Sequence, residues 1–171
     1  MHPNSGEVLV DGKNISNGIR SWQNLIGYVP QNVYLSDDTL KKNIALGIFE
    51  ELIDNNKIED CLKSSKLQGF ISQLNNGVNT KVGEFGDRIS GGQRQRIGIA
   101  RALYHNPVIL ILDEYTNALD IENEKKIVDE VNLLKGKKTI IMISHRLSAL
   151  SNCDKIYKIT KKGILGYEIQ K

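Results

Sequence analysis

The stretch Ile89-Ser90-Gly91-Gly92-Gln93-Arg94-Gln95-Arg96 decides how the rest of the chain is interpreted. Two adjacent glycines follow a serine and lead into a predicted helix, whose apolar side carries Ile97, Ala100, Leu103 and Tyr104. The helix is expected to stop at His105-Asn106-Pro107, because proline cannot continue it. Bare backbone N–H groups at a helix start are a natural seat for phosphate oxygens. This stretch therefore predicts an anion-binding helix start.

The apolar run Val108-Ile109-Leu110-Ile111-Leu112 comes next and leads directly into Asp113-Glu114. An unbroken run of this kind predicts a strand that is covered on both faces of a parallel sheet. Its end delivers two carboxylates to the C-terminal edge of the sheet, where such folds bind ligands. The sequence therefore predicts an α/β fold with a mostly parallel sheet.

Further strands are predicted on either side of this centre. Residues 7–10 and 13–15 predict a hairpin around Asp11-Gly12, and residues 25–29 predict a strand closed by Pro30. A second buried strand is predicted at 139–143, and it ends in Ser144-His145. The alternating run 155–159 predicts a half-exposed strand, followed after Gly163 by a last strand at 164–169.

Helices are predicted between the strands. Residues 39–46 suit a short helix capped by Asp37 or Asp38, and Asn56 is a candidate cap for a second helix. A third helical stripe carries Phe70, Ile71 and Leu74 and is ended by Asn76-Gly77. Asp120 is expected to cap a helix that Gly136 terminates, with an apolar stripe of Ile127, Val128, Val131 and Leu134.

Several of these segments resemble motifs of the ATP-binding-cassette (ABC) ATPases. Residues 89–93 are similar to the signature motif of that family, 109–114 to its Walker B strand, and 115–120 to its D-loop. Gln31 resembles the Q-loop glutamine and His145 the H-loop histidine, while Thr80-Lys81-Val82-Gly83-Glu84 resembles a segment typical of exporter-type members. The order and spacing of these segments also match the family.

The resemblance implies a P-loop NTPase-like ABC cassette across residues 1–171. Residues 38–104, approximately, would form its inserted helical subdomain, and 1–37 with 105–171 would form the remaining core. It further implies ATP and Mg²⁺ as cofactors. Asp113 and Gln31 would hold the metal, Glu114 would act as general base, and His145 would orient Glu114 and the attacking water.

The resemblance also implies two kinds of protein partner. In the family, two cassettes pair head to tail, so Ser90, Gly91, Gly92 and Gln93 would close on the ATP of the partner, with Asp120 at the junction. A transmembrane domain would be the second partner, at the cytoplasmic face of a cell membrane. Two positions depart from the family pattern: Tyr115 replaces a usual small residue, and Asn117, which we expect to tune communication between the two sites, replaces a usual serine.

No stretch of the 171 residues matches G-x-x-x-x-G-K-[ST], the phosphate-binding loop of this family. We therefore expect a cassette that lacks its N-terminal part, and a chain that alone binds ATP weakly and does not hydrolyse it. The absent strand would pair beside the 139–143 strand. We accordingly expect an open strand edge, an uncovered apolar face and marginal stability or aggregation.

Net charge and cysteine spacing argue against two kinds of site, one for nucleic acid and one for a metal held by cysteines. A net charge of +3 does not indicate nucleic acid, and Cys61 and Cys153 lack the spacing of metal ligands. The leading interpretation is an ATP-hydrolysing subunit of an export transporter. The alternatives are an inactive remnant or non-hydrolytic interaction module, a partial cassette whose signature stretch serves a complete one, and an ABC ATPase of DNA repair.

Overall fold

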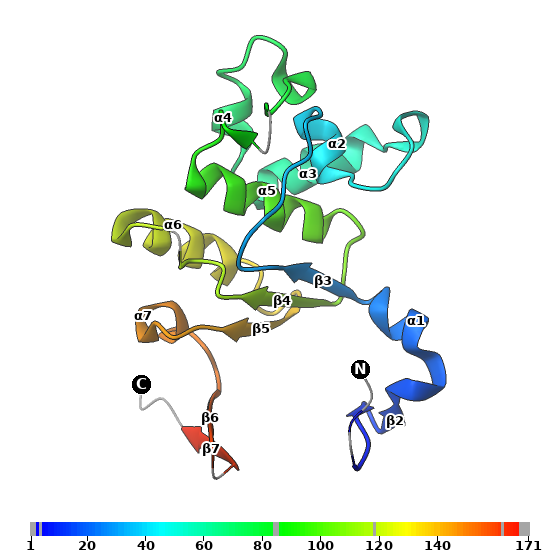
Figure 1. The fold of residues 1–171 in the computed structure, drawn as a ribbon, viewed down its shortest axis with the longest axis vertical. Coiled ribbons are helices and arrows are strands. Elements are labelled where there is room, and N and C mark those ends of the chain that lie inside the picture. Colours follow the sequence, from blue (N-terminus) through cyan, green and yellow to red (C-terminus); the bar gives the residue numbers. More distant parts are fainter. Residues whose placement is uncertain (1–2, 4, 84–85, 118, 162, 168–171) are drawn as a thin grey trace.

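The computed structural model describes residues 3, 5–83, 86–117, 119–161 and 163–167. At its centre three parallel strands pair in the order β3 (Ile26–Val29), β4 (Ile109–Asp113) and β5 (Thr139–Ile143), as Figure 1 shows. The register sets Tyr28 opposite Ile111 and Ile111 opposite Ile141. The predicted α/β fold with a parallel sheet is thereby confirmed.

Helices α5 (Gly91–Leu103) and α6 (Ile121–Asn132) lie against one face of this sheet (Figure 1). Val29, Leu110 and Leu112 point to that face and are completely buried. Helix α5 approaches β3 very closely, because a Cβ on Gly27 would lie 2.5 Å from the carbonyl oxygen of Ala102. Glycine at position 27 therefore permits this approach of helix and strand.

The opposite face of the sheet is open in the part of the chain that the structure describes. Tyr28, Ile141 and Ile143 point to it and are 51%, 47% and 48% exposed. The prediction that β4 and β5 are covered on both faces is therefore wrong for the described residues. Strand β5 also pairs only with β4 there, so the expected apolar face and open strand edge are both present.

The segment between β3 and β4 is mostly helical. It contains α2 (Leu40–Ile44), the 3₁₀ turn η2 (Glu50–Leu52), α3 (Asn55–Ser64), α4 (Gln68–Ile71), the 3₁₀ turn η3 (Gly77–Asn79) and α5. Tyr104, at the end of α5, ties this segment together, because its hydroxyl accepts a hydrogen bond from the backbone N–H of Asp54 at 3.0 Å. The third predicted helix is shorter than expected, and Leu74 lies beyond its end.

Two predicted helix caps are wrong. Helix α2 is capped by Thr39, whose hydroxyl accepts from the N–H of Lys42, while Asp38 instead accepts from the N–H of Thr39. Helix α3 is capped by Asp54, whose Oδ1 accepts from the N–H of Asn56 at 2.9 Å. In both cases several neighbouring side chains could cap, and the backbone conformation selects one of them.

Two hairpins and two short helices complete the fold. Strand β1 (Leu9–Val10) pairs antiparallel with β2 (Lys13–Asn14) in the predicted hairpin, and β6 (Ile156–Thr160) pairs antiparallel with β7 (Gly163–Tyr167). The turn η1 (Ile15–Gly18) and α1 (Ile19–Gln23) lead into β3, and α7 (Leu147–Leu150) follows β5. Glu84, Ala118 and residues 168 and 169, which the sequence analysis used, lie outside the described residues.

No helix in the described ranges is long and apolar enough to span a bilayer. The longest described helices, α5 and α6, have 13 and 12 residues. About 20 predominantly apolar residues are needed for a membrane-spanning helix.

The open face predicts different effects for two substitutions that remove apolar side chains from adjacent strands. Leu112→Ala empties space beneath α5 and α6 and should lower the free energy of unfolding by about 2–5 kcal/mol. Ile141→Ala removes a side chain that is 47% exposed, and the loss should be about 1 kcal/mol or less. Urea denaturation of the two variants checks this, and equal losses would mean that the face is covered in solution.

Candidate functional site

The carboxyl ends of the three parallel strands bring the predicted catalytic residues together. Glu114 directly follows β4, and its N–H donates to the carbonyl of Ile143 at the end of β5, at 2.9 Å. The strand β5 then leads to His145, whose Nε2 lies 2.9 Å from Glu114 Oε1. From the other neighbouring strand, Gln31 donates through Nε2 to Glu114 Oε2 at 2.8 Å. Gln31 and His145, which lie far apart in the sequence, therefore both contact the carboxylate of Glu114.

Glu114 itself has an unusual backbone conformation. Its φ angle is +44°, in the left-handed region that residues other than glycine rarely adopt. The sharp reversal turns its side chain back over the strand ends, where it is 20% exposed, while the His145 side chain is 86% exposed. Asn117 also donates through Nδ2 to Glu114 Oε2. The carboxylate is thus held by three side chains.

Asp113 lies on the open face of the sheet. Its Oδ2 accepts a hydrogen bond from the hydroxyl of Tyr28 at 2.8 Å. This bond, helped by partial burial and by the charge of Asp113, raises the pKa of Tyr28 above its ordinary value. Tyr28 was not identified from the sequence, although β3 and β4 in this register set it on the same face as Asp113.

The donor atoms available near Asp113 suit magnesium. Mg²⁺ takes oxygen ligands and is usually bound by one or two carboxylates with water and substrate phosphates. Asp113 offers a carboxylate, and Gln31 has its amide oxygen free of the bond that its Nε2 makes to Glu114. The described residues contain no group of three or more His, Cys, Asp or Glu side chains that could hold a metal by themselves. This small oxygen set fits a metal that is shared with phosphates.

The signature stretch, Ser90 to Gln93, begins helix α5 as a capping box. Ser90 Oγ accepts from the N–H of Gln93 at 3.3 Å, and Gln93 Oε1 accepts from the N–H of Ser90 at 2.9 Å. The side chain of Gln93 is therefore engaged within its own helix. Ser90 and Gly91 are both exposed at the start of the helix.

Asp120 is the N-cap of helix α6. Its Oδ1 accepts from the N–H of Asn123 at 2.9 Å, and its Oδ2 accepts from the Asn123 amide at 2.7 Å. These bonds lower the pKa of Asp120, the backbone bond from Asn123 most of all. A Cβ on Gly92 would lie 3.8 Å from the same Asn123 side chain. Asp120 and the signature stretch therefore form a second group, on the same side of the molecule as the strand ends (Figure 1).

Two side chains that the sequence analysis did not single out connect these groups. Gln95, on α5, donates through Nε2 to the carbonyl oxygen of Gln31 at 3.0 Å. Arg146, next to His145, donates to the carbonyls of Asn117 and Leu119, each at 3.4 Å, and to the carboxylate of Glu124. Both contacts depend on how separate elements pack, so no local sequence pattern reveals them.

Helix α6 carries the two acidic anchors of this arrangement. Glu124 is 5% exposed and accepts from Arg146 and, at 2.6 Å, from the Ser148 hydroxyl. Glu130 accepts two bonds from Arg96 of α5, at 3.0 and 2.9 Å, with both side chains 15% exposed. The hydrogen bond from Ser148 is the main cause that lowers the pKa of Glu124, assisted by Arg146 and opposed by burial.

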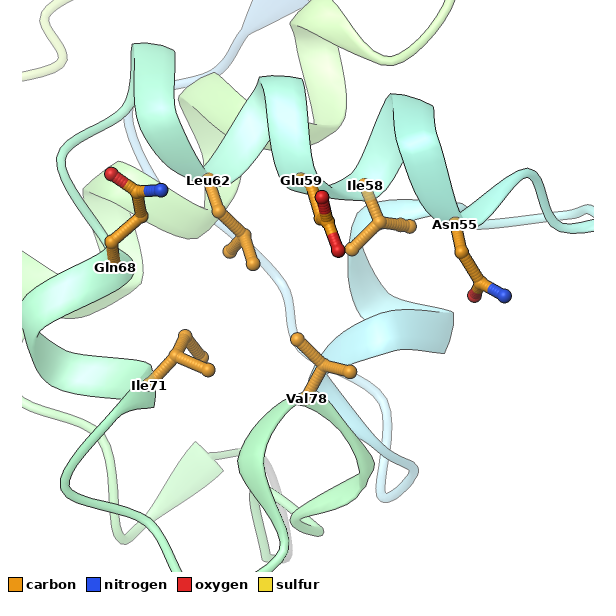
Figure 2. Close-up of a pocket in the computed structure, with 7 residues that line it drawn as sticks. All are labelled: Asn55, Ile58, Glu59, Leu62, Gln68, Ile71 and Val78. Carbon is orange, nitrogen blue, oxygen red and sulfur yellow. The ribbon is translucent and has the colours of Figure 1, made fainter.

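A hollow of about 550 Å³ lies in a different part of the molecule. Figure 2 shows the residues that line it. Ile58, Leu62, Ile71 and Val78 point into it from α3, α4 and η3, with Gln68 and Asn55 at its two ends. None of the candidate site residues lines this hollow. It therefore has no part in the chemistry at the strand ends.

Comparison with known proteins identifies the family. The sequence profile described as ABC transporter matches residues 1–117. Multidrug resistance protein 1 of Entamoeba histolytica is 44% identical over 165 residues, which cover 95% of this chain and 13% of that protein. The ATP-dependent lipid A-core flippase of Saccharophagus degradans is 46% identical over 152 residues, which cover 88% of this chain and 26% of that protein.

A solved structure of a bacterial Atm1-family ABC exporter with ATP bound matches the fold with a TM-score of 0.79. It is 37% identical, and the match covers 91% of this chain and 27% of that chain. The chain belongs to the ABC transporter family and corresponds to part of the ATP-binding cassette of its exporter type. It spans between 13% and 27% of the length of these relatives.

Gly92 and Gly98 provide a matched test of what each glycine on α5 is for. A Cβ on Gly98 would lie 2.5 Å from Val33 Cγ2, so Gly98→Ala should destabilise the fold by about 1–3 kcal/mol through overpacking. A Cβ on Gly92 would meet Arg96 at 3.6 Å, an ordinary contact, so Gly92→Ala should leave the free energy of unfolding unchanged within about 1 kcal/mol. Urea denaturation checks both, and a large loss for Gly92→Ala would show that packing within the chain already requires this glycine.

The lowered pKa of Glu124 predicts a pH-dependent contribution to stability. A carboxyl with a depressed folded-state pKa stabilises the fold above its unfolded pKa, about 4.3, and this contribution is lost as the pH falls through the folded value. Glu124→Gln should therefore lower the free energy of unfolding by about 1–3 kcal/mol at pH 7. Breaking a fully buried ion pair would lower it by ~3–5 kcal/mol, and the effect is smaller here because Arg146 is half-exposed. The difference from the unchanged chain should shrink below about pH 4. Denaturation curves at several pH values check this, and a constant difference would contradict it.

Proposed function

We propose that this chain is part of the ATP-hydrolysing cassette of a transporter that drives export across a membrane. The observation that carries the proposal is the Glu114 carboxylate, contacted at once by Gln31 and His145. A general base needs a carboxylate held within reach of water and oriented by neighbouring donors. Family membership in the exporter type supports the same reaction.

Each residue at the strand ends has a role in the proposed reaction. Asp113, through its carboxylate, and Gln31, through its amide oxygen, would hold Mg²⁺, while the Gln31 nitrogen stays on Glu114. Glu114 accepts a proton from water as the water oxygen bonds to the γ-phosphorus and the bond to the ADP oxygen breaks. His145 donates to the γ-phosphate and keeps Glu114 oriented. Mg²⁺ supplies neutralisation of phosphate charge.

The second group of residues serves a partner. Ser90, Gly91, Gly92 and Gln93 close on the nucleotide of a second cassette, and Asp120 holds the adjoining loop as the cap of α6. The exposure of Ser90 and Gly91 at the start of α5 supports this, because a partner can reach them. The helical residues 38–104 and the segment at Lys81 lie towards a transmembrane domain, on the cytoplasmic side of the membrane.

The 171 residues alone are proposed to bind ATP weakly and not to hydrolyse it, because they contain no G-x-x-x-x-G-K-[ST] loop. The alternative is an inactive remnant or interaction module. In the described residues β5 has an unpaired edge and one face of the sheet exposes apolar side chains. Both the active cassette and the inactive remnant would therefore be more stable with another segment covering this face.

A chimera tests the proposal. A segment that ends in a G-x-x-x-x-G-K-[ST] loop and its helix is joined in frame before this chain, and ATP hydrolysis is measured as phosphate release. We expect no release from the 171-residue chain, steady release from the chimera, and a loss of about 10²–10⁴-fold in its Glu114→Gln variant. The matched control Glu59→Gln, in an exposed position on α3, should retain the rate.

Each unexpected outcome of this experiment decides between the alternatives. A folded chimera that binds ATP without hydrolysing it would favour the inactive remnant. Micromolar affinity and phosphate release by the 171-residue chain would contradict the proposed dependence on an added loop. Unchanged hydrolysis by Glu114→Gln would remove Glu114 from the role of general base.

A further inference from the structure

The Glu114 carboxylate has a third partner, Asn117, that the roles above do not use. Its two oxygens differ in their surroundings. Oε2 accepts from the amides of both Gln31 and Asn117, while Oε1 has one close partner among the described residues, the Nε2 of His145 at 2.9 Å. The side chain as a whole is 20% exposed, so water retains access to it.

Asn117 reaches this carboxylate because the chain reverses immediately after β4. The N–H of Asn117 donates to the carbonyl of Glu114 at 3.0 Å, which closes a turn over residues 114–117. Arg146 donates to the carbonyl of Asn117 at 3.4 Å and holds the turn from the other side. The turn is therefore closed without the side-chain amide of Asn117, which remains available to contact the Glu114 carboxylate.

The two oxygens of the Glu114 carboxylate offer a limited number of acceptor positions. An ionised carboxylate has about four lone-pair positions, two on each oxygen. On Oε2 both are taken by the amide donors of Gln31 and Asn117. Oε1 has the Nε2 of His145 at 2.9 Å, so at most one of its positions is occupied and at least one remains open among the described residues.

We propose that Asn117 is a positioning residue for Glu114: by occupying the last acceptor position on Oε2, it leaves Oε1, beside His145, as the oxygen that accepts the proton of the attacking water. This rests on the proposed role of Glu114 as general base. Gln31 alone would leave one position open on each oxygen, so two orientations of the carboxylate would compete. The Asn117 amide removes one of them.

The loop between Asn117 and Asp120 affects the Glu114 carboxylate through the same amide. Asn117 belongs to the segment 117–120, which continues to the cap of α6 at Asp120. A partner that displaces this segment would withdraw the Asn117 amide from Oε2 and free that oxygen. The orientation of the base is thereby made dependent on the position of the loop. Serine at position 117 ends one bond closer to the backbone, and its hydroxyl would not reach as the amide does.

Side-chain NMR of the 171-residue chain, labelled with ¹³C and ¹⁵N and free of nucleotide, tests the proposal. We expect a nuclear Overhauser effect between the Asn117 amide protons and the Glu114 Hγ protons. Hydrogen exchange of that amide should be about tenfold slower or more than in Glu114→Ala, as for a hydrogen bond to a charged group. Asn117→Ser should shift the ¹³Cδ signal of Glu114 and the amide signals of Gln31.

Asn123 provides the matched control, since its amide also donates to a carboxylate three residues earlier, that of Asp120, at 2.7 Å. Asn123→Ser should move the signals of Asp120 and leave the Glu114 ¹³Cδ signal unchanged. The proposal is overturned if the unchanged chain lacks the Asn117–Glu114 effect, or if Asn117→Ser leaves Glu114 unmoved. Failure of hydrolysis in the chimera would not alter these spectra, so the two failures can be told apart.

Discussion

Parallel pairing on both sides of β4 is the constraint on which the rest of the structure depends. Because β3, β4 and β5 run in one direction, the segments that follow them leave from the same edge of the sheet. The N–H of Glu114 extends the pairing by one residue, to the carbonyl of Ile143. Gln31, Glu114 and His145 meet for this reason alone, and an antiparallel arrangement of β5 would send His145 to the opposite end.

Helix α6 connects the two groups of candidate site residues mechanically. Glu130 pairs with Arg96, five residues after Gly91 on α5, and Glu124 pairs with Arg146, the neighbour of His145. The Arg96–Glu130 pair is largely shielded from solvent, whereas in the Arg146–Glu124 pair only the carboxylate is buried. Helix α6 is therefore linked to three parts of the candidate site: the helix that carries the signature stretch, the loop capped by Asp120, and the segment around His145.

Local sequence patterns predicted the strands β3, β4 and β5 and the helices α5 and α6, because their apolar periodicity and their breakers, such as Pro107 and Gly136, act over a few residues. The caps at Thr39 and Asp54 were missed, since adjacent Asp, Asn and Thr side chains have similar capping ability. Of the site, the motifs predicted Gln31, Glu114 and His145. Tyr28, Gln95 and Arg146 act across elements, and only register and packing reveal them.

The left-handed backbone at Glu114 sets the conformational preference of the main chain against the contacts of the side chain. A φ of +44° costs roughly 1–2 kcal/mol for a residue that carries a Cβ, and glycine would relieve it. An acidic side chain therefore persists at this position against the preference of its own backbone. Glycine at position 114 would relieve the backbone but would also remove the carboxylate that Gln31, Asn117 and His145 contact, so the two contributions to stability oppose each other at this one residue.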